Sequence, residues 1–177
     1  MLEDPRTILN LLVAAIVAMK LPNSLGGDGE IPLFQAVKIY DLEDLSKALE
    51  ELLLFKDRVA LVLLEDVTFD AQIAGRVLTA KRDVDVILLL ADRNWSNRNK
   101  ALLGDTTTPG GILLGHLVVD ALAGERDGFV IQPGLGEIFA LQGKVRDNAT
   151  GRIAWRQELK IPAGVLRRTL SREAKIQ

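Results

Sequence analysis

The segment from residue 81 to residue 124 constrains the fold most strongly, because it joins three different patterns in one order. Residues 84–90, VDVILLL, are a continuous apolar run of strand length. Residues 91–108 are a mostly polar break of roughly eighteen residues. A loop of this length in a compact domain is usually functional or disordered. Thr108 and Pro109 then favour a helix start, and Gly124 favours its end. The segment therefore predicts a strand, a long break and a helix.

The helix expected at residues 109–123 is amphipathic. Its apolar side chains recur at helical spacing, which predicts that one face packs on a sheet. The residues expected on that face are Leu114, Leu117, Val118, Ala121 and Leu122.

Other strands are predicted on both sides of this unit. Residues 34–40 alternate as in a short strand, and residues 59–64, VALVLL, suit a central strand covered on both faces. Residues 65–80 are expected to form a loop followed by a weaker strand that leads to the Lys81–Arg82 pair. Residues 137–145 and 152–161 resemble a β-hairpin around a turn at 147–151, with Trp155 half in the core.

Two further helices are expected in the N-terminal third. Residues 8–19 are apolar, with Asp4 as a cap and Pro5 at the first helical position. This stretch is well short of the ~20 residues that cross a bilayer, so we expect a buried or interface helix. Asp41 offers a cap for a second helix over residues 42–55. The glycine-rich residues 21–32 lie between the two as a loop, without the Lys-Ser/Thr pair of a phosphate-binding loop.

The elements together predict a fold of the α+β class. With 177 residues, 48% of them hydrophobic, the chain can bury one sizeable core. We expect a single domain over residues 1–165, with a mixed, mostly antiparallel sheet of about five or six strands packed against about two or three helices. Residues 166–177, which include Arg167 and Arg168, are expected to be a basic tail or a short helix.

The composition leaves little catalytic machinery. The formal charge is -2, so no global basic field attracts nucleic acid, and we expect neither specific nucleic-acid binding nor membrane association. The chain has no cysteine, which removes disulfides and thiolate chemistry. His116 is the single histidine, and no nucleophile motif accompanies it. We therefore expect no enzyme activity, no catalytic residue, no metal and no cofactor.

Acidic side chains keep one enzymatic alternative open. Glu65, Asp83 and Asp85 lie near strand ends and could hold a hard cation, as in a metal-dependent hydrolase or nuclease. Asp92 follows the same strand. Nothing near these residues resembles a calcium loop, so ordinary solvation of strand ends is the favoured interpretation.

The polar break contains the best candidate for an interaction surface. Trp95 lies among basic residues there, a weak version of a basic and aromatic nucleic-acid patch, and a loop that docks on protein explains it as well. The candidate interaction residues are Arg93, Trp95, Arg98, Lys100, Asp105, Arg167 and Arg168.

The order of elements also resembles a known family. The chain is similar to the small tail proteins of Mu-like phages and prophages in the order of its segments. These are a strand, a polar break, a helix opened by P-G-G and ending in A-L-A-G, a G-F-V-I-x-P-G segment and a final strand pair. These proteins act as tail terminators or tail-completion proteins. The resemblance covers roughly residues 59–161, and the N-terminal helix and glycine-rich loop lie outside it.

The resemblance implies a structural virion protein of a contractile or long-tailed phage. It implies an α+β domain that forms a ring, a hexamer, capping the tail tube. The implied partners are other copies of the chain, the tail tube and sheath proteins, and the head-completion or connector protein. The location would be the virion, and the host cytoplasm during assembly. The second candidate is an α+β adaptor domain that binds a bacterial protein or peptide.

Overall fold

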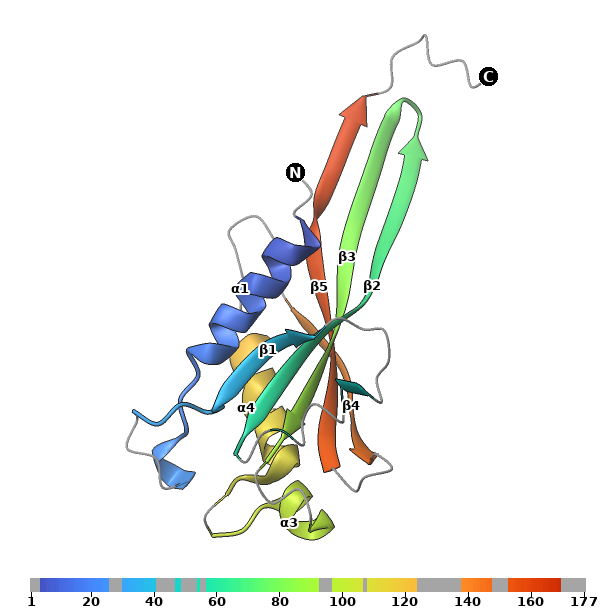
Figure 1. Ribbon diagram of the computed structural model, residues 1–177. Helices are drawn as coiled ribbons and strands as arrows, with labels where there is room; N and C mark the ends of the chain where they lie inside the picture. Colours follow the sequence, from blue (N-terminus) through green and yellow to red (C-terminus); the bar gives the residue numbers. More distant parts are fainter. Residues whose placement is uncertain are drawn as a thin grey trace.

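Five strands form one mixed sheet, with helices packed against it, so the chain is a single α+β domain as predicted (Figure 1). The computed structural model describes residues 4–25, 30–40, 47–48, 54, 57–92, 97–106, 108–123, 138–147 and 153–169. In spatial order the strands are β1 (Ala36–Tyr40), β2 (Val59–Ala74), β3 (Val77–Ala91), β5 (Ile153–Thr169) and β4 (Phe139–Asp147). β1 is parallel to β2, and the other neighbouring pairs are antiparallel.

Two helices cover one face of the sheet. α1 (Pro5–Val17) begins as predicted, with the Asp4 carboxylate accepting a 2.9 Å hydrogen bond from the backbone N–H of Arg6. α4 (Gly110–Ala123) lies beside it. The apolar stripes of both helices pack on one set of alternate strand residues, and the core on this face includes Ile8, Leu12, Ile16, Leu114, Val118, Leu122, Val62, Val86, Leu88 and Leu159. Ala121, expected on the buried stripe of α4, is exposed.

The opposite face of the sheet is also buried near the centre. Leu61, Leu63 and Leu89 point to this side and are fully buried, together with Ala48. The central position predicted for residues 59–64, covered on both faces, is therefore confirmed. Residues 47 and 48 are helical, while most of the helix expected over residues 42–55 lies outside the described residues.

β2 and β3 form a long hairpin where a loop was expected. The prediction of a loop within residues 65–80 is wrong, because β2 continues to Ala74 and β3 begins at Val77 after a two-residue turn. Gly75 at the turn has a φ of 62°, and Arg76 does not have a positive φ, which is the pattern of type II′ hairpin turns. The alternation of Val67, Phe69, Ala71 and Ile73 with polar residues supports this strand.

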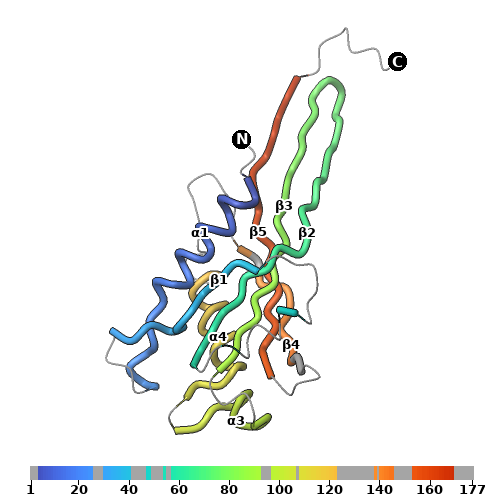
Figure 2. Tube along the Cα trace, viewed as in Figure 1, coloured from blue at the N-terminus to red at the C-terminus, as the bar shows by residue number. Residues whose placement is uncertain are grey.

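Three strands project beyond the helices. Figure 1 and Figure 2 show the ends of β2, β3 and β5 continuing past α1 as a narrow three-stranded extension. We call it the blade: residues 66–74 of β2, 77–83 of β3 and 165–169 of β5. The prediction of a basic tail or short helix from residue 166 is wrong for residues 166–169, which belong to β5, and residues 170–177 lie outside the described residues.

The polar break between β3 and α4 contains a helix of its own. α3 (Arg98–Leu103) lies within it, with the Asn97 side chain accepting a 3.2 Å hydrogen bond from the backbone N–H of Lys100. Ala101 is buried and α3 packs against α4 and β5. α4 begins at Gly110, one residue later than expected, and the backbone N–H of Gly110 donates a hydrogen bond to the carboxylate of Asp92.

Candidate assembly surface

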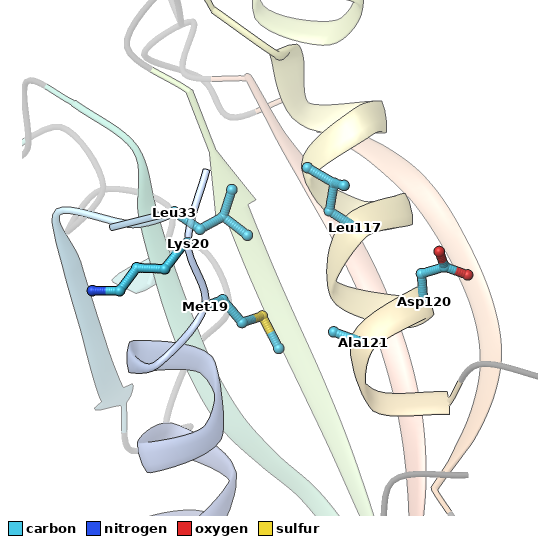
Figure 3. A pocket seen from close by; sticks show the side chains of 6 residues that line it. All are labelled: Met19, Lys20, Leu33, Leu117, Asp120 and Ala121. Carbon is cyan, nitrogen blue, oxygen red and sulfur yellow. The ribbon is translucent and has the colours of Figure 1, made fainter. Parts of the chain in front are cut away.

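A hollow of about 360 Å³ separates α4 from the segment that follows α1. Figure 3 shows Met19 and Leu33 on one side and Leu117 and Ala121 of α4 on the other. The side chain of Lys20 extends away from α4 in this view, so it does not contact Asp120 of that helix. The hollow is open and has a mixed lining, and its two charged side chains, Lys20 and Asp120, do not point toward one another.

His116 borders a second hollow of about 330 Å³, between α4 and the β4–β5 pair. Trp155 lines it and donates a 3.3 Å hydrogen bond from Nε1 to Oε1 of Gln157. Gly115 of α4 and Gly143 of β4 lie so close to the indole that a Cβ would stand 2.3 Å and 2.2 Å from its nearest atoms. Trp155 is half-buried as predicted, and its ring occupies the space that these glycines leave.

A charged cluster lies on the other face of β5. Arg156 Nη2 is 2.8 Å from Glu65 Oε1 and 2.9 Å from Glu158 Oε1, and Lys144 Nζ is 3.1 Å from the same Glu158 oxygen. Gln142 donates a 2.6 Å hydrogen bond to the other oxygen of Glu158. These contacts join β2, β5 and β4 across the sheet.

The ionisation of Glu158 is adjusted by this cluster. Burial by itself raises the pKa of Glu158, but hydrogen bonds from Gln142 and Lys144 and the charge of Arg156 outweigh it and hold the pKa below its usual value. Ionised Glu158 on β5 contacts the cations of Arg156 and Lys144. Because Lys144 and Gln142 belong to β4, these contacts connect the outer strand β4 to the rest of the sheet.

The acidic residues considered above as a metal site form ion pairs with basic side chains. Lys160 Nζ lies 4.0 Å from Asp83 and 3.8 Å from Asp85, and Glu65 contacts Arg156. Within the described part of the chain, His, Asp and Glu side chains form no group of three or more that could hold a metal ion. Every helix of the described residues is too short or too polar to cross a membrane.

The structure places the predicted interaction residues at two opposite ends. Arg98 and Lys100 lie on α3 at one end of the sheet, where Lys100 Nζ is 3.5 Å from Asp105 (Figure 1). Arg167 and Arg168 lie on β5 at the tip of the blade, at the other end. The remaining candidates, Arg93 and Trp95, lie outside the described residues.

The blade is the surface that sequence reasoning missed. Phe69 and Ile73 are 62% and 66% exposed, and Leu166 of β5 is 40% exposed. The strand register turns all three toward the same face of the blade, because Phe69 pairs with Arg82, Ile73 with Leu78 and Leu166 with Ala80. The guanidinium of Arg82 lies 5.9 Å from the centre of the Phe69 ring. The alternation of apolar and polar residues over 67–73 is the sequence pattern that could have predicted this strand.

The comparisons with known proteins add no family assignment. No protein-family model matches the chain, and no curated protein matches it significantly in sequence.

Proposed function

We propose that this chain is a structural protein that assembles with copies of itself into a closed ring. The observation that carries the proposal is the blade, the part of the sheet that projects beyond α1 and α4, on which large apolar side chains such as Phe69 and Ile73 are exposed to water. Contiguous exposed apolar surface on a folded protein marks an interaction site. Burial of each such side chain contributes about 1.5–3 kcal/mol.

We propose further that the ring, a hexamer, caps the tail tube of a phage or prophage and joins it to the head-completion proteins. This part rests on the resemblance of residues 59–161 to small tail proteins of Mu-like phages. In this proposal the end that carries α3 contacts the tail tube, since Arg98 and Lys100 are exposed there, far from the blade. Each end of the molecule then has its own partner.

The experiment measures the mass of the purified full-length chain by native mass spectrometry and images it by negative-stain electron microscopy. The expected result is one discrete oligomer with a central opening, which attaches to one end of isolated phage tail tubes. A chain that stays monomeric at every concentration contradicts the ring. Rings that never attach to tubes contradict the tail role alone. A monomer that binds a bacterial protein at one-to-one ratio supports the adaptor alternative instead.

A further inference from the structure

The blade has two outer strand edges that no described strand covers. β1 pairs with β2 only as far as Leu63, although β2 continues to Ala74. β4 pairs with β5 only as far as Lys160, although β5 continues to Thr169. An uncovered strand edge is a template for pairing with a strand of another chain.

The two edges carry opposite charge. β2 contains three acidic residues and no Lys or Arg, whereas β5 beyond Leu159 contains three basic residues and no acid. Glu65 and Lys160 are already paired within the chain. Among the described residues, the side chains of Asp70, Arg167 and Arg168 form no ion pair. One edge of the blade is therefore acidic and the other is basic, so the two are complementary.

The complementary charges also lie on the same face of the sheet. Asp70 pairs with Lys81, and Thr79, two residues away on the same strand, pairs with Arg167. Directly paired residues, and residues two apart on one strand, point to the same face. Because β2 and β5 are both antiparallel to β3, they run parallel to each other. A rotation about an axis along the blade would therefore set β5 of one copy beside β2 of the next in parallel.

We infer that the basic outer edge of β5 in one copy pairs with the acidic outer edge of β2 in the next copy, so that the blades join into one closed sheet around the ring. This inference rests on the proposed self-assembly. A symmetric contact would set Asp70 against Asp70 of another copy, or Arg167 against Arg167. Such like-charge pairs are destabilising in a sheet. A head-to-tail contact avoids both and closes under rotation.

The first test is cross-linking, for which the chain is well suited because it has no cysteine of its own. Gln72→Cys and Thr169→Cys place single thiols on exposed positions of the two edges, on the same face. One variant is labelled with ¹⁵N, the two are mixed, and a flexible bis-maleimide is added. The expected product is a dimer that contains one chain of each variant. Cross-links between identical variants overturn the inference.

The second test reverses charges in the full-length chain. Asp70→Arg and Arg167→Asp are each expected to weaken the oligomer about tenfold, and the double variant is expected to recover the wild-type mass distribution. Arg6→Asp, an exposed change on α1, is the control that leaves the oligomer unchanged. If both single reversals leave the oligomer intact, the edge pairing is wrong while the ring stands. A monomeric wild-type chain overturns both proposals.

Discussion

The carboxylate of Asp92, the residue after β3, accepts a 2.7 Å hydrogen bond from the backbone N–H of Gly110, the first residue of α4. The side chain of Asp92 is fully buried. A helix N-terminus has unpaired N–H groups and a partial positive charge, so a carboxylate stabilises it. The bond thereby fixes α4 to the end of the central strand across the α3 segment.

We expect Asp92→Ala to lower the free energy of unfolding by about 1–3 kcal/mol, because it leaves a buried N–H without this acceptor. Asp92→Asn keeps an oxygen at nearly the same place and should cost less. Urea denaturation followed by circular dichroism measures both. Equal stability of the alanine variant and the wild type would show that the bond contributes nothing.

Gly115 is expected to resist substitution because the indole of Trp155 occupies the place of its side chain. Gly115→Ala should destabilise the fold by about 1–3 kcal/mol, the usual effect of overpacking. Gly111→Ala in the same helix is the milder comparison, since its Cβ would stand 3.3 Å from the Ala101 carbonyl oxygen and 3.4 Å from Trp155 Cβ, tight contacts that a small shift can relieve. Thermal unfolding compares the two variants, and a similar melting temperature for both would argue against a clash with Trp155.

Glu158 should contribute to the pH dependence of stability. Its pKa is lowered in the folded chain, so its stabilising effect is present above the unfolded-state pKa and is lost as the pH falls through the folded-state pKa. We expect Glu158→Gln to have a lower melting temperature than the wild type at neutral pH. The two curves should converge as the pH falls below the usual pKa of a glutamate and Glu158 becomes protonated in the folded chain. A difference that stays constant over this range would contradict the sign of the shift.

Ile73 tests the apolar face of the blade without affecting the core. Ile73→Ser should change the free energy of unfolding of the monomer by less than about 1 kcal/mol, because the side chain is exposed. It should nevertheless weaken the oligomer, as measured by native mass spectrometry at several concentrations. Leu103→Ser is the matched control, since Leu103 is 73% exposed on α3 at the other end of the sheet. An oligomer unaffected by Ile73→Ser would remove the blade face from the assembly contact.

Local sequence patterns were sufficient to predict most of the helices and strands. Asp4 and Pro5 predicted the start of α1, because a capping carboxylate and a fixed φ act within a few residues. The continuous apolar run of residues 59–64 predicted a strand buried on both faces, since only such a position removes every one of those side chains from water.

Two different causes explain the errors. The alternation of residues 67–73 is a local signal for a strand, and the prediction of a loop within residues 65–80 overlooks it, whereas the structure pairs residues 66–74 with β3. The cap of α4 could not be found from neighbouring residues, because Asp92 is eighteen positions away in the sequence. Arg98 and Arg167 were grouped by residue type, and the fold places them at opposite ends.

The sequence by itself determined which segments bury apolar side chains and hence the α+β class, because burial patterns repeat at the short periods of helices and strands. Only the tertiary structure decided where the sheet leaves its helices and extends as a blade. The position of the blade depends on how far the two helices extend along strands of unequal length. The short repeat of apolar residues in a helix or strand does not contain that information. The blade, with Asp70 on one edge and Arg167 on the other, is where we place the contact between copies.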